Sequence, residues 1–207
     1  MSYAEKSLEQ FTALLASSAP APGGGGACAL CGALAAALGS MVGHLTVGKA
    51  RYAQNESALH ALGERAEKLR IELLEMIDGD EAAFAPLSQA YALPKDTPGR
   101  EETLERCLLS AAASPMRIAE LCCEAVELCE GYAALGSRLV LSDAATGAAL
   151  ASGALRGAVI NIKVNTALMR DRSAAAALDA RADALEKEYA ARSDAVCVAV
   201  AAALGFS

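Results

Sequence analysis

Residues 20–52 read PAPGGGGACALCGALAAALGSMVGHLTVGKARY, and this stretch decides the fold. It opens with two prolines and four consecutive glycines, Gly23 to Gly26, and it then contains no Asp, Glu, Lys or Arg before Lys49. Because proline and glycine keep a helix from starting earlier, we expect a helix from about Gly26 to Tyr52, with its free N–H groups directed toward the glycine loop. Its many glycines and alanines leave one side almost bare, which predicts close approach of another backbone or of a ligand.

The composition around this stretch favours an all-α protein. Hydrophobic residues make up 54% of the 207 residues, aromatic residues only 4%, and Trp is absent. Most of the apolar content is Ala, Leu and Val, and Ala and Leu are strong helix formers. No segment resembles a linker, so we expect one helical domain over residues 1–207. The net charge is −7 and no basic face dominates, which argues against nucleic acid as a partner.

The uncharged run over residues 11–48 is long enough to raise the question of a membrane span. The proline-glycine loop interrupts this run, and the remainder is rich in Ala, Gly and Ser and has no aromatic belt. We therefore expect no membrane partner, although a small-residue helix also suits a bilayer. The N-terminus does not have the shape of a signal peptide, and seven cysteines are an odd number without an export signal. These features predict a reduced, cytoplasmic protein.

Helical periodicity continues along the rest of the chain, interrupted by short loops. Gly79 and Pro86 suggest a bend or a break in one long helix, and the pair Ser114-Pro115 is typical of a helix N-terminus. The sequence thus predicts a bundle of about six to eight helices. The expected helices cover residues 2–17, 26–52, 56–91, 100–113, 114–135, 142–169 and 172–204.

Few polar residues in these helices suggest chemistry by themselves. Asp80 and Phe84 lie four residues apart and share a helix face. This spacing is compatible with an apolar pocket beside Asp80, where the pKa of a carboxyl group rises, but spacing alone favours a solvated acidic helix face. The glycine loop offers backbone N–H groups to an anion, but it is equally explained as a plain turn. Asp143 reads as a helix cap. Asn161 and Asn165 lie four residues apart on one face of an apolar helix, and their amides need hydrogen-bond partners that either a ligand or another helix can supply.

The cysteines do not form a recognisable metal site. Cys28 and Cys31 make one C-x2-C pair, but no second pair follows, and His44 and His60 are badly spaced for a zinc finger. We expect small buried thiols and no metal ion.

Four segments, in order, carry a resemblance to a known family. They are the stretch over residues 20–52 and the segments IDGDEAAFAPLSQAYALPKDT, SPMRIAELCCEAVEL and LSDAATGAALASGALRGAVINIKVN. Together they resemble the formiminotransferase-cyclodeaminase C-terminal family over roughly Leu8 to Asp171. This family includes the cyclodeaminase domain of a bifunctional folate enzyme and free-standing bacterial methenyltetrahydrofolate cyclohydrolases.

The resemblance implies an all-α homodimer that acts on a tetrahydrofolate derivative without a metal ion or a further cofactor. Two reactions are implied: hydrolysis of 5,10-methenyltetrahydrofolate to 10-formyltetrahydrofolate, or closure of 5-formiminotetrahydrofolate to 5,10-methenyltetrahydrofolate with loss of ammonia. It assigns acid-base catalysis to Asp80, with Lys49 as a second catalytic candidate. The implied substrate-binding residues are Pro22, Gly23, Gly24, Gly25, Gly26, Arg51, Asp143, Arg156 and Asn161.

Three positions depart from the family pattern. Ala50 stands where a second Lys or Arg is frequent, Ser137 where Asn is frequent, and Ala145 where Gly is frequent. The absence of a formiminotransferase part favours the cyclohydrolase. A folate-binding or assembly protein on the same fold, without turnover, is the alternative.

Overall fold

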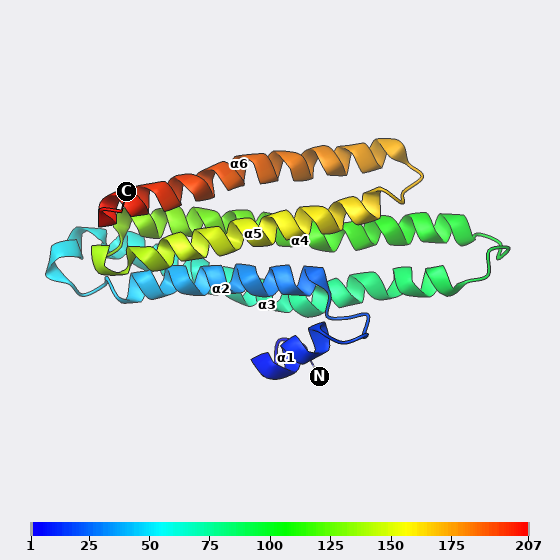
Figure 1. Ribbon diagram of the computed structural model, residues 1–207, viewed down its shortest axis with the longest axis horizontal. Helices are drawn as coiled ribbons and strands as arrows, with labels where there is room; N and C mark the ends of the chain where they lie inside the picture. Colours follow the sequence, from blue (N-terminus) through cyan, green and yellow to red (C-terminus); the bar gives the residue numbers. More distant parts are fainter. Residues whose placement is uncertain (1, 207) are drawn as a thin grey trace.

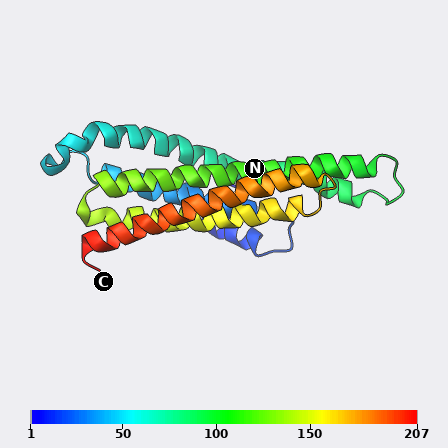
Figure 2. The same cartoon turned by 90° about the horizontal axis from the view of Figure 1, so that it is seen from above.

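Five long helices run up and down beside one another, and a short sixth helix lies against one side (Figures 1 and 2). The computed structural model describes residues 2–206, which contain no strand. The α-helices are α1 (Leu8–Leu15), α2 (Gly24–His44), α3 (Glu56–Ala92), α4 (Arg100–Leu135), α5 (Leu141–Thr166) and α6 (Arg172–Leu204). Two 3₁₀ helices, η1 (Ala50–Asn55) and η2 (Arg138–Val140), join them at one end of the bundle. The predicted all-α bundle is confirmed.

The small-residue helix is shorter than its sequence suggests. We expected it to reach Tyr52, but α2 ends at His44, and Gly48 then adopts a positive φ of 80°. That conformation is open to glycine and turns the chain before η1. Residues 45–52 therefore form a turn and the start of a 3₁₀ helix.

Proline residues do not interrupt the two longest helices. We expected a new helix at Ser114-Pro115, but α4 continues through Pro115, and α3 continues through Pro86. Each proline leaves one helix carbonyl without its usual N–H donor. Packing along the bundle outweighs this local cost, and the freed carbonyl of Ala111 is used elsewhere, as described below.

The N-terminal helix is shorter than expected. It covers Leu8–Leu15 instead of residues 2–17, and within it Phe11 is buried whereas Leu8 is 73% exposed. A capping box made by Ser7 and Gln10 starts the helix. The segment before it is tied to α3, because the backbone N–H of Tyr3 donates to Asp78 at 2.7 Å.

The glycines of α2 let neighbouring helices come close. Gly39 and Gly43 contact the ring of the fully buried Tyr132 on α4, and a Cβ at Gly39 would lie 2.7 Å from that ring. By length and composition, α2 is the one described helix that is apolar enough to cross a membrane, but 56% of this window is buried inside the bundle. Its composition is thus explained by packing inside the bundle.

Candidate functional site

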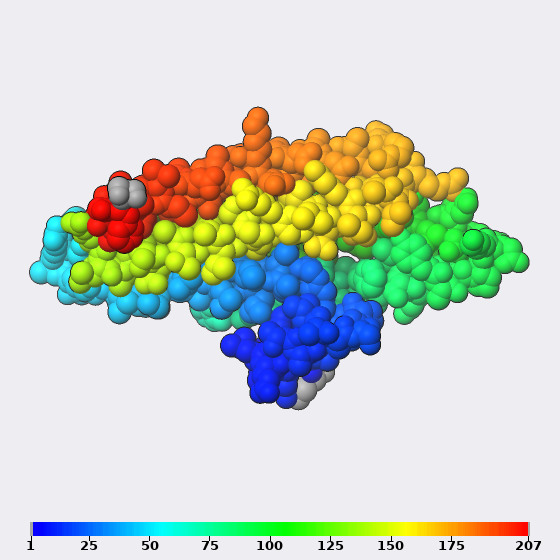
Figure 3. Space-filling model, in the orientation of Figure 1, coloured from blue at the N-terminus to red at the C-terminus, as the bar shows by residue number. Residues whose placement is uncertain are grey.

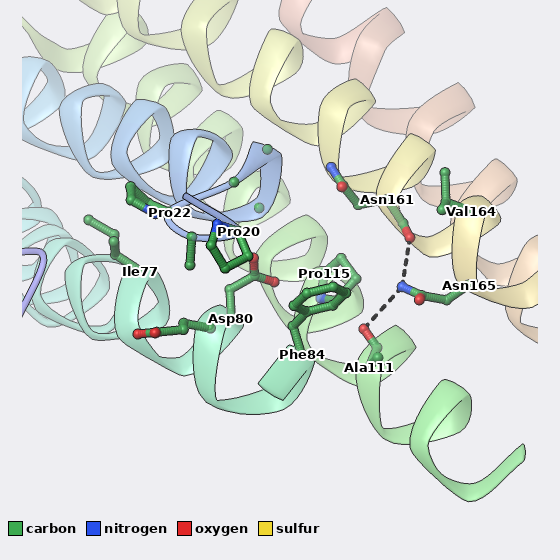
Figure 4. Close-up of a pocket in the computed structure, with 15 residues that line it drawn as sticks. Pro20, Pro22, Ile77, Asp80, Phe84, Ala111, Pro115, Asn161, Val164 and Asn165 are labelled. Atoms are coloured by element: carbon green, nitrogen blue, oxygen red, sulfur yellow. Dashed lines mark hydrogen bonds between the residues drawn. The ribbon is translucent and has the colours of Figure 1, made fainter. Parts of the chain in front are cut away.

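A cavity of about 190 Å³ lies where α2 begins, between that helix and the middle of α3 and α4 (Figure 4). The last turns of α5 close its other side. Its lining includes the proline-glycine loop, Asp80, Glu81, Phe84, Pro115, Asn161 and Asn165. The shared helix face of Asp80 and Phe84 is confirmed, because both side chains line this cavity. The bundle places residues from four distant segments around it.

Asp80 is the carboxyl group around which the cavity is built. Burial raises the pKa of Asp80, and hydrogen bonds from the Ser114 hydroxyl and the Gly26 backbone N–H act in the opposite direction. The Ser114 Oγ donates to Asp80 Oδ1 at 3.1 Å. A half-buried carboxyl group with a raised pKa is suited to accept and return a proton during a reaction.

The glycine loop serves Asp80 directly. Any Cβ at Gly25 would overlap the Asp80 carboxylate, whereas a Cβ at Gly23 would meet nothing within 4 Å. The carboxylate thus occupies the N-terminal end of α2, where helix N–H groups favour negative charge. Gly25 is glycine because the carboxylate needs its space.

Ser114 was missed from the sequence, where it reads as a helix cap. Its side chain is 8% exposed and faces Asp80 from α4. The Ser-Pro pair is a common helix start, so the sequence pattern pointed to a boundary rather than to a partner for a carboxyl group. That Ser114 lies inside a helix and faces an acidic residue becomes visible only when α3 packs on α4.

Two asparagines on α5 complete the polar wall of the cavity. Asn161 Nδ2 donates to the Gly157 carbonyl at 2.8 Å, and Asn165 Nδ2 donates to the carbonyls of Asn161 at 3.0 Å and Ala111 at 3.3 Å. Figure 4 shows the two bonds of Asn165 as dashed lines. Asn161 is a predicted site residue, and Asn165 joins it here.

The structure separates the predicted site residues into two groups. Six of them line the cavity, and the Gly26 N–H reaches Asp80. The six are Pro22, Gly23, Gly24, Gly25, Asp80 and Asn161. Lys49, Arg51, Asp143 and Arg156 do not line it. Arg156 points toward α6, where its Nε lies 3.9 Å from Glu186.

Lys49 and Arg51 lie beyond the opposite end of α2, which spans 21 residues or roughly 30 Å. Asp143, in the first turn of α5, is also remote from the cavity. Lys49 Nζ contacts Ser137 Oγ at 3.4 Å, and the Arg138 backbone N–H donates to the Tyr52 hydroxyl at 3.2 Å. Within one chain, Lys49 and Asp80 therefore do not meet.

The cysteines are free, as expected from the sequence. Burial is the main cause that raises the pKa of Cys28 to about 11, so this thiol stays protonated and is a poor nucleophile or ligand at neutral pH. Within residues 2–206, no group of three His, Cys, Asp or Glu side chains is placed to hold a metal ion. That the chain needs no further cofactor stays a prediction.

Comparison with known proteins agrees with this architecture. The family model described as formiminotransferase-cyclodeaminase matches residues 7–184. A methenyltetrahydrofolate cyclohydrolase of Methylorubrum extorquens is 40% identical over 172 residues, which cover 81% of this chain and 83% of that protein. The formimidoyltransferase-cyclodeaminase of Mus musculus is 31% identical over 81% of this chain, a match that spans 32% of its own length.

Structural comparison gives the same result. The crystal structure of a formiminotetrahydrofolate cyclodeaminase from Thermotoga maritima superposes with a TM-score of 0.82 at 25% identity, covering 97% of this chain and 96% of that one. Sequence and fold therefore agree over most of the chain, and this protein belongs to the formiminotransferase-cyclodeaminase family.

Proposed function

We propose that this protein is a folate one-carbon enzyme that works at the carbon between N5 and N10 of a tetrahydrofolate derivative. The first candidate is hydrolysis of 5,10-methenyltetrahydrofolate to 10-formyltetrahydrofolate. The observation that carries the proposal is the half-buried Asp80, held by Ser114 and Gly26 inside a cavity of a family whose named members act on this carbon.

In the proposed hydrolysis, the Asp80 carboxyl group acts first as general base and then as general acid. Ionised Asp80 takes a proton from water as the water oxygen bonds to the methenyl carbon. The same carboxyl group then returns a proton to N5 as the carbon–N5 bond breaks, which leaves the formyl group on N10. One proton of the water is released overall. A carboxyl group with a raised pKa is suited to both steps.

The charge of the cavity favours such a substrate. Its described lining residues include two acids, Asp80 and Glu81, and no Lys, Arg or His. The methenyl group carries a positive charge shared between N5 and N10, so ionised carboxylates attract it. A formimino group is likewise an amidine that binds a proton.

The cyclodeaminase reaction is the second candidate, because it uses the same carbon. N10 would attack the formimino carbon, Asp80 would take the N10 proton, and the departing nitrogen would leave as ammonia after gaining a proton. The relative named a cyclohydrolase is 40% identical, whereas the mouse bifunctional protein is 31% and the Thermotoga maritima cyclodeaminase 25% identical, which favours hydrolysis here.

Purified protein separates these reactions and the binding-only alternative. We expect 5,10-methenyltetrahydrofolate to lose its methenyl absorbance faster than in buffer. Ammonia release from 5-formiminotetrahydrofolate would identify the cyclodeaminase instead. Tight binding of either compound without turnover would support a binding protein and overturn both enzymatic assignments.

We further propose that the enzyme is a cytoplasmic homodimer. Helices α2 and α5 lie side by side on the face shown in Figure 3. Their exposed residues on this face include large apolar side chains and glycine. Leu34 and Ile160 are 47% and 63% exposed on it, and a Cβ at Gly153 would meet nothing within 4 Å. A two-fold axis across α2 would bring the Lys49 end of one copy to the Asp80 end of the other.

A further inference from the structure

The side-chain polar groups of the cavity divide unevenly between donors and acceptors. Asp80 and Glu81 carry carboxylates, Asn165 uses both of its N–H groups on backbone carbonyls, and Asn161 uses one of its two on Gly157. A carbonyl oxygen can only accept a hydrogen bond, so these partners fix which amide atom is nitrogen. Among the described residues, neither asparagine Oδ1 accepts a hydrogen bond. The two amide oxygens are therefore available to a ligand.

Pro115 explains why Asn165 keeps this orientation. Proline has no N–H, so it leaves the carbonyl of Ala111, four residues earlier on α4, without a helix donor. Asn165 Nδ2 supplies that donor from α5 at 3.3 Å. A rotated amide would place its oxygen against the Ala111 carbonyl, which is repulsive. The proline in α4 thus holds the amide of Asn165 in one orientation.

Asn161 is held beside the glycine loop. Its Nδ2 is bonded to Gly157 at 2.8 Å, and a Cβ at Gly24 would lie 3.4 Å from its Oδ1. In Figure 4 the Asn161 side chain points toward the first turn of α2. Its amide oxygen lies on the wall that α5 contributes, while Asp80 projects from α3 on another wall.

We propose that the Asn161 and Asn165 amide oxygens recognise the N–H groups of an aminopyrimidine ring, so that the pterin end of the substrate enters this cavity. The inference rests on the proposed folate function and deepens it. A pterin presents a 2-amino group and ring N–H groups, which match a wall of acceptors. The glutamate end carries carboxylates, which Asp80 and Glu81 repel.

The size of the cavity agrees with this orientation. Its volume of about 190 Å³ is smaller than the roughly 300–1,000 Å³ of pockets that enclose drug-sized ligands. It therefore holds a ring system and leaves the p-aminobenzoyl-glutamate part of the substrate outside. The carbon between N5 and N10, at the junction of the two parts, then lies within reach of Asp80.

The test uses tetrahydropterin, its 2-desamino analogue and p-aminobenzoyl-glutamate as separate probes, each titrated calorimetrically into the intact protein. We expect tetrahydropterin to bind at least ~10-fold more tightly than the 2-desamino analogue, the size of one or two net hydrogen bonds. In Asn161→Leu this preference should fall to within about 3-fold. Lys163→Gln, on the same helix but paired with Asp183, should keep the full preference.

The outcomes separate this inference from the proposed function. Equal binding of the two pterins by the parent protein, or an unchanged preference in Asn161→Leu, overturns the inference even if methenyltetrahydrofolate is hydrolysed. Binding of p-aminobenzoyl-glutamate that is lost in Asn161→Leu would place the other end of folate here and also overturn it. If the parent protein shows pterin selectivity but no turnover, the enzymatic proposal fails and the orientation stands. Asn165→Asp serves as the second variant. It keeps the shape of the side chain but removes its N–H donors, so the Ala111 carbonyl loses its hydrogen bond and the variant should unfold at a lower temperature than the parent protein.

Discussion

Asp80 is a residue whose environment opposes its own ionisation. Burial raises its pKa, so the folded protein binds this proton more tightly than the unfolded chain does. The stability from the raised pKa is present at low pH and is lost as the pH rises through that pKa. Ionised Asp80 therefore lowers the stability of the folded protein at neutral pH. This loss of stability accompanies the placement of a catalytic carboxyl group in a buried position.

Asp80→Asn keeps the shape of the side chain and removes its charge. We expect turnover to fall by about 10²–10⁴-fold, because the acid-base group is lost. The variant should be at least as stable as the parent protein at pH 7, and the gap should narrow in acid. Initial rates and thermal unfolding between neutral and acidic pH measure both effects. An active variant would remove Asp80 from the mechanism, and one destabilised most at neutral pH would contradict the assigned direction of its pKa.

Ser114 acts through Asp80. Its hydrogen bond lowers the pKa of Asp80, so Ser114→Ala should raise that pKa further and move the acid limb of the pH–rate profile to higher pH. The pH–rate profile of kcat measures this shift. A lower rate with an unmoved profile would mean that Ser114 has only a packing role, and Ser114→Thr, which retains the hydroxyl, should restore the profile.

Gly25 and Gly23 form a matched pair. Gly25→Ala places a methyl group where the Asp80 carboxylate lies, so the carboxylate must rotate away. Displacement of a catalytic group by about 1 Å can cost 10²-fold, and we expect a loss of that order with little loss of helix content. Gly23→Ala adds a methyl group that meets no atom of the protein within 4 Å on an extended backbone, so it should leave the carboxylate in place and lose less activity than Gly25→Ala. Equal rates for the two variants would contradict the close contact between loop and carboxylate.

At this scale the sequence alone identified part of the site. The spacing of Asp80 and Phe84 predicted one shared face, and the resemblance added the glycine loop and Asn161. The role of Ser114 was not predicted, because it depends on which helices become neighbours. A hydroxyl at a Ser-Pro pair has a common local explanation as a helix cap, and only the bundle excludes it. Asn165 was expected to need a hydrogen-bond partner, and the bundle shows that one partner is the Ala111 carbonyl on α4.

At the scale of helices, packing overrules local signals. Pro86 and Pro115 are breakers in sequence, yet α3 and α4 pass through them because both helices are held along their length by neighbours. The predicted end of α2 was also wrong, since the small and apolar residues up to Val47 do not distinguish a last helical turn from the turn that follows the helix. The existence and order of the long helices followed from periodicity, and their boundaries did not.

The contact between α2 and Tyr132 makes a prediction about stability. Gly39→Ala would put a Cβ 2.7 Å from the buried ring, and overpacking of this kind costs about 1–3 kcal/mol. Gly63→Ala, on α3 with no atom within 4 Å, should instead stabilise by about 0.5–1 kcal/mol through helix propensity. Denaturant unfolding of both variants tests this. A Gly39→Ala protein as stable as Gly63→Ala would mean that α2 and α4 shift apart without cost.

At the scale of the whole molecule, the two predicted catalytic residues, Asp80 and Lys49, lie near opposite ends of α2. The cavity with Asp80 carries two acids and no cation among its described lining residues, while Lys49 and Arg51 lie beyond the far end of α2. A substrate with a cationic centre and a carboxylate tail needs both kinds of surface. A second copy related by a two-fold axis across α2 would supply the cations near the mouth of each cavity.

Leu34→Glu tests this arrangement, because Leu34 is 47% exposed near the middle of α2. Burying an unpaired carboxylate in an apolar interface is costly, so we expect a monomer by light scattering where the parent protein is a dimer. Val198→Glu makes the same change at a 69% exposed position on α6, which packs on α5 and α4, and should leave the dimer intact.

If Lys49 acts across the interface, Leu34→Glu should also raise the KM for a folate bearing glutamate while tetrahydropterin binding stays unchanged. A monomeric Leu34→Glu protein with an unaltered KM would support the proposed dimer interface but place substrate binding within one chain. A Leu34→Glu protein that stays dimeric would show that the interface lies on another face.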